Sequence, residues 1–300
     1  MNSPVIDIRP ATNMDDIRQI ETVQLLAWGM PDIEVIPCRF MHAVEHNGAC
    51  LLAAYDGSKV VGFAFGLLGL SAVINPKIAE KAGLLQMYSA ISGVLPDYQL
   101  SGVGYRLKMA QRDFALANGI RLITWTYDPL ESRNGYFNVN KLGVICGRYL
   151  RDFHGDMGGI NAGLPTDRFH VDWWLDSQQV HHLVGGQQIV GRRATLLVEN
   201  SEIINRAAFD EGGLATPPAD FSRSDSPHLL VEIPADFQRL KSRNMALAIA
   251  WRQHTRQLFE HTFASGYQVT GFVRWADAEG FERSYYLVEK LEVGELPHEN

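Results

Sequence analysis

The sequence predicts an α/β fold in which a mixed β-sheet is flanked by helices. Up to about residue 160, strand-like segments with alternating apolar residues take turns with helix-like segments, whose apolar residues recur every three or four positions. The chain has 300 residues, of which 46% are hydrophobic and 20% are charged. This composition is ordinary for a globular protein, so it excludes a wholly disordered chain and allows one large domain or two smaller ones.

The elements of the first half follow from local signals. Asn13 is placed to cap a helix, the pair Asp56-Gly57 is typical of a hairpin turn, and Asn118-Gly119 ends a helix. We therefore expect, in chain order, a strand at 5–9, helices at 13–28 and 37–45, strands at 50–55, 59–66 and 85–95, a helix that ends at 118–119, and a strand at 120–127. The apolar face of the last helix consists of Leu107, Ala110, Phe114 and Ala117.

The second half is expected to form a domain of its own, which divides the chain into residues 1–164 and 165–300. The stretch Leu229–Gln238 echoes Ile91–Gln99, and both are followed by a helix and then a strand, the later one at 268–275. A degenerate internal repeat that has lost the glycine loop of the first copy would explain this order. Chance similarity between two strand-helix-strand units explains it equally well.

Charge and cysteine content narrow the classes of partner and site. The formal charge is −7, from 27 Lys and Arg against 34 Asp and Glu, and no basic tract occurs, so we expect neither nucleic acid nor an anionic membrane as a partner. No apolar run reaches the roughly 18 to 20 residues of a membrane span, and the first residues lack a secretory pattern, so we expect a cytoplasmic protein. The scattered Cys38, Cys50 and Cys146 predict no disulfide framework, and no metal is expected.

The most informative segment is a short glycine loop at the start of a helix. Gly102 and Gly104 let the backbone approach a ligand where a Cβ atom would collide, and a helix N-terminus offers unpaired N–H groups to an anion. Such a loop suits a diphosphate, although an ordinary tight turn would also account for the glycines. Arg106 and Lys108 are either a further source of positive charge for a phosphate or plain solvated surface.

The motif Gln99-x-x-Gly102-x-Gly104, after a strand and before an amphipathic helix, resembles motif A of the GNAT superfamily of acyl-CoA-dependent N-acyltransferases. The resemblance covers roughly residues 5–155, because the helices, the hairpin and a second motif that ends at Gly143 follow in the order of that superfamily. More narrowly, the run 125–143 is similar to a branch of predicted acetyltransferases of about this length with a C-terminal extension. Some of that branch are associated with N-succinylation of amino acids.

The resemblance implies a GNAT-like sheet, a C-terminal half that is GNAT-like in degenerate form, and acetyl-CoA or another acyl-CoA as co-substrate. The diphosphate would bind the backbone of the glycine loop, and the pantetheine arm would lie along the strand before it. In that superfamily the fourth and fifth strands splay apart, which leaves backbone N–H groups free for the thioester. The implied cofactor-binding residues are Val94, Leu95, Gln99, Gly102, Val103, Gly104, Tyr105, Arg106 and Asn134.

The usual general acid of the superfamily is a tyrosine four residues before the glycine of the second motif. Counted from Gly143, that position holds Val139 here, so the standard acid is missing. Tyr149 and Tyr88 are the proposed replacements. Each has an alternative interpretation as a half-buried aromatic residue of the core.

The sequence therefore predicts an N-acyltransferase that moves an acetyl or a succinyl group from CoA to a primary amine of a small molecule, such as an amino acid. The amine would attack directly in a ternary complex, and Arg168 would bind an acceptor carboxylate or form a structural salt bridge. The alternative is a non-catalytic acyl-CoA-binding or interaction protein. A homodimer held by the C-terminal half is a further expectation.

Overall fold

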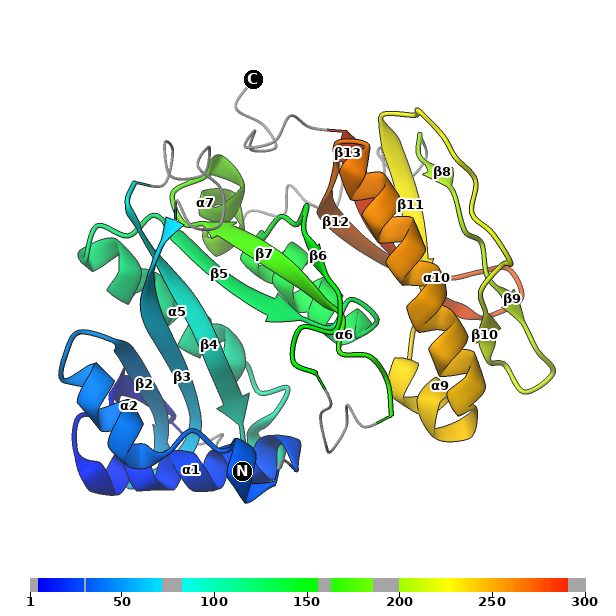
Figure 1. Ribbon diagram of the computed structural model, residues 1–300. Coiled ribbons are helices and arrows are strands. Elements are labelled where there is room, and N and C mark those ends of the chain that lie inside the picture. The colour runs from blue at the N-terminus through cyan, green and yellow to red at the C-terminus, as the bar shows by residue number, and fades with distance from the viewer. Residues whose placement is uncertain (1–4, 30, 72–82, 156–162, 186–199, 291–300) are drawn as a thin grey trace. The chain divides into compact units, whose positions relative to one another are not determined.

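The computed structural model describes residues 5–29, 31–71, 83–155, 163–185 and 200–290. These residues form two compact units. The first contains the described residues up to Trp125, and the second contains those from Thr126 onward (Figure 1). This division differs from the expected boundary between residues 164 and 165.

The first unit is built on a mixed sheet, as the sequence predicts. Its strand order is β1-β2-β3-β4-β5, in which β1 to β4 are antiparallel neighbours and β5 runs parallel to β4. The last two residues of β5 belong to the second unit. The strands are β1 (Asp7–Pro10), β2 (Cys50–Asp56), β3 (Lys59–Leu70), β4 (Leu85–Val94) and β5 (Leu122–Tyr127).

Two helix ends of the first unit lie at the signals read from the sequence, the start of α1 (Met14–Trp28) at Asn13 and the end of α5 (Val103–Ala117) before Asn118-Gly119. Helix α1 is capped by Asn13, whose side chain accepts a hydrogen bond from the Asp16 N–H at 2.9 Å. It ends at Gly29, which has a left-handed φ of 61°. The other helical elements are the turn η1 (Asp32–Glu34), α2 (Cys38–Glu45), the turn η2 (Pro96–Tyr98) and α5 (Val103–Ala117).

Helices α1 and α5 cover opposite faces of this sheet. A Cβ atom added to Gly93 of β4 would meet Trp28 of α1, whereas one added to Gly62 of β3 would meet Leu107 and Val103 of α5. Gly62 is adjacent to Phe63, the register partner of Gly93, so the two glycines face opposite sides. Glycine in the sheet therefore lets each helix approach closely.

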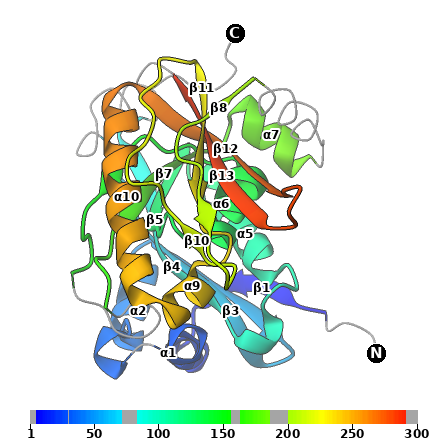
Figure 2. The same cartoon turned by 90° about the vertical axis from the view of Figure 1, so that its right-hand side faces the viewer.

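The second unit contains a further sheet, of order β12-β13-β11-β8, and the long helix α10 (Figure 2). Strand β13 is antiparallel to β11 and β12, and β8 is parallel to β11. A short antiparallel pair, β6 with β7, is linked to β12 through the bridge between Cys146 and Val269. The elements are α6 (Ser132–Gly135), the π-helical segment η3 (Tyr136–Leu142), β6 (Tyr149–Leu150), β7 (Arg168–Trp174), α7 (Gln178–Val184), β8 (Glu202–Ile203), β9 (Ala208–Phe209), β10 (Ala215–Thr216), β11 (His228–Ile233), α9 (Phe237–Arg243), α10 (Met245–Ala264), β12 (Tyr267–Ala276) and β13 (Glu282–Lys290).

Residues 126–155 belong to the second unit because their polar groups bond to its last strands. The side chain of Asn140 donates to the Phe272 carbonyl at 2.5 Å and accepts from the Phe272 N–H at 3.1 Å. The Tyr286 hydroxyl donates to the Pro129 carbonyl at 2.9 Å. A boundary at residue 164 would separate these partners.

The strands that the repeat hypothesis equates are arranged differently in the two units. In the first unit, β4 and β5 are hydrogen-bonded neighbours. In the second unit, β13 lies between β11 and β12. The similar order of elements along the chain therefore does not give the same strand pairing.

No helix within the described ranges has the length and apolarity that crossing a membrane requires.

The close contact at Gly93 gives a test of the packing of α1. Gly93→Ala should lower the free energy of unfolding by roughly 1–3 kcal/mol, because the new Cβ atom would lie 2.5 Å from the Trp28 ring. Gly69→Ala is the matched control, since its Cβ atom would make only an ordinary contact with Gln86 at 3.8 Å. Urea unfolding of both variants measures the difference. Equal losses of stability would contradict the packing described.

Candidate functional site

The glycine loop joins β4 to α5 and presents backbone N–H groups. Gly102 caps α5 with a φ of 85° and no side-chain hydrogen bond. The first helical bond runs from the Arg106 N–H to the Gly102 carbonyl, at 3.1 Å. The N–H groups of the residues before Arg106 precede this bond, so they are not used within the helix. They form the positive end of the helix dipole, which favours an anion.

The space in front of these amides is open. A Cβ atom on Gly102 would meet nothing within 4 Å, and one on Gly104 would meet only Val94 Cγ2, at 4.0 Å. The left-handed φ of Gly102 favours glycine at this position. An ordinary turn with the same φ would favour glycine too, so Gly102 alone does not indicate a ligand. Gly104 has no such requirement, and glycine inside a helix is about 1 kcal/mol less favourable than alanine. Open approach to the backbone is what this second glycine provides.

Strands β4 and β5 part soon after they meet. Among the described residues, their parallel pairing joins Met87 to Ile123 and Tyr88 to Thr124, and β4 then continues to Val94. We call the unpaired stretch of β4 from residue 89 to residue 94, together with Trp125 of β5, the fork. The base of the fork is the point just past Tyr88 and Thr124. This arrangement is the splay that the sequence resemblance implies.

The edge of β4 that lines the fork offers backbone groups. The Leu95 N–H donates to the Val61 carbonyl of β3 at 2.9 Å. Because backbone groups alternate in direction along a strand, the N–H and C=O of Val94 point toward the fork. The Val94 carbonyl accepts a hydrogen bond from Gln99 Nε2 at 3.1 Å. Gln99 therefore fixes the loop against the open end of the fork.

The structure brings most of the predicted cofactor residues together. Those of the first unit are Val94, Leu95, Gln99, Gly102, Val103, Gly104, Tyr105 and Arg106. Val103 is buried, and a Cβ atom on Gly62 would contact its side chain at 3.3 Å, so Val103 offers its backbone and not its side chain. The Arg106 guanidinium donates to the Ile6 carbonyl at 2.6 Å, which gives it a partner within the protein. Asn134 is exposed on α6 and belongs to the second unit.

The two candidate tyrosines have different surroundings. Tyr88 is half-buried at the base of the fork, where it is the register partner of Thr124. Tyr149 lies in the second unit, where its ring packs on Phe169 and its hydroxyl donates to Asp167 Oδ2 at 2.7 Å. Burial, followed by the charge of Asp167, raises the pKa of Tyr149 well above its usual range. These contacts favour the alternative that Tyr149 is a core residue, whereas Tyr88 stays a candidate.

Arg168 takes part in a buried ion cluster of the second unit. Its guanidinium lies 3.6 Å from Asp128 Oδ2. Asp128 also accepts from Arg252 Nη1 at 2.9 Å, and Arg252 is 1% exposed. The contact of Arg168 with Asp128 is the structural salt bridge that the sequence left open as an alternative to carboxylate binding.

Lys108 is a residue that sequence reasoning misjudged. It is neither a phosphate ligand nor solvated surface, since it is 5% exposed on the face of α5 that packs on the sheet. Its Nζ donates to Ser89 Oγ at 2.7 Å and lies 4.0 Å from the centre of the Trp125 ring. Burial lowers the pKa of Lys108 to about 7.

The signal that was missed is the exact orientation of helix α5. Its buried residues are Val103, Leu107, Lys108, Gln111 and Ala115. The predicted apolar face shares only Leu107 with this set, because it relied on alanines and a phenylalanine that the helix leaves at the margin or in solvent. Residues four and seven positions after Gly104 lie on the same side of a helix as Gly104. A face counted from Gly104 would therefore have included Lys108 and Gln111.

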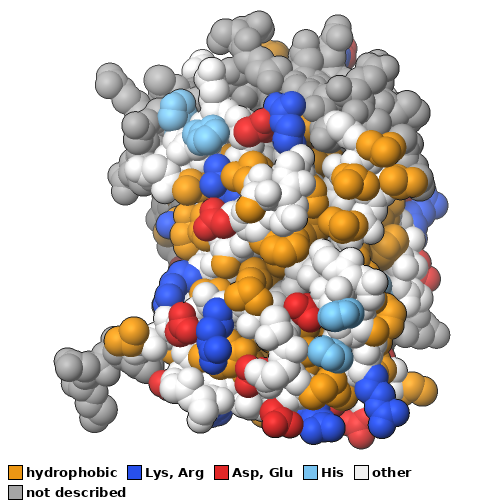
Figure 3. All heavy atoms as spheres, turned by 90° about the vertical axis from the view of Figure 1, so that its left-hand side faces the viewer, with side chains coloured by type: hydrophobic (Ala, Val, Ile, Leu, Met, Phe, Trp, Pro, Cys, Tyr) orange, Lys and Arg blue, Asp and Glu red, His pale blue; other side chains and the backbone are white. Residues whose placement is uncertain are grey.

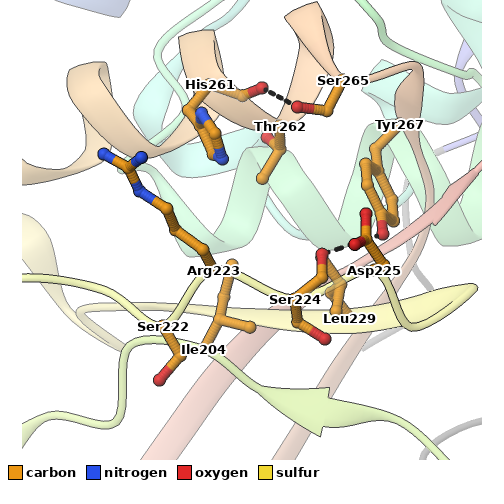
Figure 4. Close-up of a pocket in the computed structure, with 10 residues that line it drawn as sticks. All are labelled: Ile204, Ser222, Arg223, Ser224, Asp225, Leu229, His261, Thr262, Ser265 and Tyr267. Carbon is orange, nitrogen blue, oxygen red and sulfur yellow. Dashed lines mark hydrogen bonds between the residues drawn. The ribbon is translucent and has the colours of Figure 1, made fainter.

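The second unit has a separate polar cavity of about 240 Å³ (Figure 4). Figure 4 shows Arg223 and His261 on one side of it and Asp225 and Tyr267 on the other. The hydroxyl of Thr262 donates to the Phe259 carbonyl, that of Ser265 to the His261 carbonyl, and that of Tyr267 to the Ser226 carbonyl. These hydroxyl donors are thus used within the protein. The other lining residues are Ile204, Ser222, Ser224 and Leu229.

Charge on the face in Figure 3 is mixed. Lys and Arg side chains lie among Asp and Glu, and hydrophobic side chains are scattered between them (Figure 3). Within the ranges that the structure describes, no three His, Cys, Asp or Glu side chains gather as metal ligands would.

Solved structures similar to this chain are acetyltransferases. The ribosomal-protein-S18-alanine N-acetyltransferase from Escherichia coli is 13% identical, with a TM-score of 0.45 over 58% of this chain and 96% of the other. NAA60 from Arabidopsis thaliana in complex with acetyl-CoA is 16% identical, with a TM-score of 0.46 over 58% of this chain and 100% of the other. An acetyltransferase of the GNAT family from Streptococcus pneumoniae is 13% identical, with a TM-score of 0.43 over 56% and 98%. No protein-family model and no curated protein matches the chain.

The buried amine of Lys108 predicts a pH dependence of stability. Its folded pKa of about 7 is below the ordinary 10.5, so between these values the unfolded chain binds a proton that the folded chain lacks. This group therefore makes the folded state more stable as the pH rises through that window, by at most about 1.4 kcal/mol per pH unit. Lys108→Met should remove this slope and raise the free energy of unfolding at pH 7. Urea unfolding from pH 7 to 10 measures it, and an unchanged slope in the variant would contradict the assignment.

The ion cluster of the second unit predicts a second effect on stability. Asp128→Ala should lower the free energy of unfolding by about 3–5 kcal/mol, because it leaves the buried Arg252 without its partner. The double variant Asp128→Leu with Arg252→Met should recover part of this loss, since the more deeply buried charge of Arg252 is then removed with its partner, while Arg168 still loses its contact with Asp128. Urea unfolding of the full chain compares the variants. A double variant less stable than Asp128→Ala would contradict the account.

Proposed function

We propose that this protein is an acyl-CoA-dependent N-acyltransferase that moves an acetyl or a succinyl group to a primary amine. The observation that carries the proposal is the glycine loop of the first unit. Its open backbone amides at the N-terminus of α5 adjoin the free edge of β4, so one surface offers an anion site and a strand edge together. A diphosphate followed by an amide-containing arm matches that pair of features.

The residues of the first unit would bind the carrier mainly through their backbone. The amides of Gly102, Val103, Gly104 and Tyr105 would hold the diphosphate, with little need for net positive charge. The N–H and C=O of Val94 would pair with the amide groups of the pantetheine arm, as an added strand pairs with a sheet edge. The Gln99 side chain, which now donates to the Val94 carbonyl, would have to move aside.

The bound acyl-CoA would supply the acyl group as a thioester. The amine nitrogen would form the C–N bond of the amide while the C–S bond breaks, and the proton that the nitrogen loses would end on the released thiol. The pKa of an alkyl ammonium group is about 3 units above pH 7, so deprotonating it to free the lone pair costs about 4 kcal/mol. A backbone N–H of the fork that donates to the thioester oxygen would lower the barrier, by roughly 3–4 kcal/mol in comparable sites.

Tyr88 is the residue that we propose as general acid, because it lies at the base of the fork and the usual position holds the buried Val139.

The acceptor is proposed to be a small amine such as an amino acid. The similar structures include the ribosomal-protein-S18-alanine N-acetyltransferase from Escherichia coli, so a protein N-terminus belongs in the same test. The rival function, binding of acyl-CoA without catalysis, is favoured by Val139 and by the core contacts of Tyr149.

Substitution of Gly104 tests the proposed binding surface. Gly104→Leu should weaken CoA binding at least about 100-fold, because the side chain would fill the space in front of the amides. The fold should persist, since a Cβ atom there meets only Val94 at 4.0 Å. Isothermal titration with CoA measures the affinity, and Gly69→Ala on β3 is the control. Wild-type affinity in Gly104→Leu would overturn the proposed site.

Turnover separates the proposed enzyme from its non-catalytic rival. Acetyl-CoA and succinyl-CoA are each supplied with a panel of amino acids, small amines and peptides with free N-termini, and thiol release is followed. Release that depends on the amine supports the proposal. Tight CoA binding without release over the whole panel would establish the rival.

A further inference from the structure

The base of the fork is closed by a buried amine. Ser89 is the first residue of β4 past the last pair with β5, and Trp125 is the first residue of β5 past it. Lys108 Nζ contacts both, at 2.7 Å from Ser89 Oγ and 4.0 Å from the centre of the Trp125 ring. This single nitrogen therefore bridges the two strands at the point where they part.

The amine has no acidic partner among the described residues. The contacts of its nitrogen are the Ser89 hydroxyl and the Trp125 ring, and its titratable neighbour is the Cys50 thiol of β2, whose pKa burial raises to about 12. Buried lysines are normally paired with a carboxylate. The amine at this point thus lacks an anion that would stabilise its ammonium form.

A second unused donor lies beside it. Gln111 is fully buried, and its Oε1 accepts from Ser89 Oγ at 3.0 Å, while its Nε2 has no hydrogen-bond partner. Lys108 and Gln111 therefore both contact the same serine, and both carry N–H groups that could serve an oxygen acceptor. A carboxylate is the small anion with two oxygens that such a pair suits.

We propose that Lys108, with Gln111 beside it, selects an acyl group that ends in a carboxylate, of which succinyl is the probe. This inference rests on the proposed function, because it takes the acyl end of the carrier to the base of the fork. The geometry supports that path. The diphosphate site at Gly104 adjoins Val94, and the five residues of strand from Val94 back to Ser89 span roughly 16 Å. The acyl group is the far end of a chain anchored at the loop, so it arrives where Lys108 lies.

The test measures the affinity of CoA, acetyl-CoA and succinyl-CoA by isothermal titration at pH 8. The wild-type protein should bind succinyl-CoA at least about tenfold more tightly than acetyl-CoA. Titration in two buffers of different ionisation enthalpy should reveal proton uptake with succinyl-CoA alone, because a carboxylate beside Lys108 favours the ammonium form. Lys108→Met should lose both the preference and the proton uptake, and Ser89→Ala should reduce the preference. Arg18→Met, which removes an exposed cation of α1, should keep both.

Each other result has a defined meaning. If CoA binds but the wild-type protein treats the two thioesters alike, or if Lys108→Met keeps the preference, the assignment of Lys108 is wrong while the proposed function stands. If neither CoA nor its thioesters bind, the proposed function fails and this inference falls with it. Far-ultraviolet circular dichroism of Lys108→Met and Ser89→Ala establishes that each variant is folded before its affinities are compared.

Discussion

The parting of two parallel strands is the constraint on which the candidate site depends. A buried backbone N–H or C=O that lacks a partner is costly, so a strand edge inside a protein must be paired, covered or reserved for a ligand. Strand β4 loses its pairing with β5 after Tyr88, yet it continues to Val94 with only β3 paired beside it. The glycine loop begins at that open end, with Gln99 holding the Val94 carbonyl. Strand edge and helix N-terminus thus meet at one place, and both present backbone groups that the fold leaves unpaired.

The same parting explains why a lysine is tolerated in the interior. Where β4 and β5 stay together, backbone pairs fill the space between them. Past Tyr88 there is a gap in the pairing, and Lys108 reaches it with a long flexible stem, a charged end and the face of Trp125 beneath it. The cost of its burial is visible as the lowered pKa of its amine. Polar groups of this kind in an otherwise apolar layer mark a position where packing alone does not decide the residue.

Local signals predicted the first unit well, and long-range packing decided what was missed. Asn13 and the Asp56-Gly57 turn act through neighbours a few residues away, so sequence alone locates α1 and the β2–β3 hairpin. The glycine loop is equally local, and its place before α5 was correctly read. The burial of Lys108 depends on which face of α5 meets the sheet, and Ala110, Phe114 and Ala117 placed that face wrongly by part of a turn. The domain boundary depends on Asn140 and Phe272, which lie 132 residues apart, and no local pattern records such a contact.

The two hydrogen bonds between the Asn140 side chain and the Phe272 backbone also bear on how the protein is synthesised. Synthesis proceeds from the N-terminus at roughly 5–20 residues per second, so the 132 residues between these partners take roughly 7–26 seconds to emerge. During that interval the chain already contains every strand and helix of the first unit. The segment that follows β5 must wait for its partners, with its polar groups bonded to water and its apolar residues uncovered.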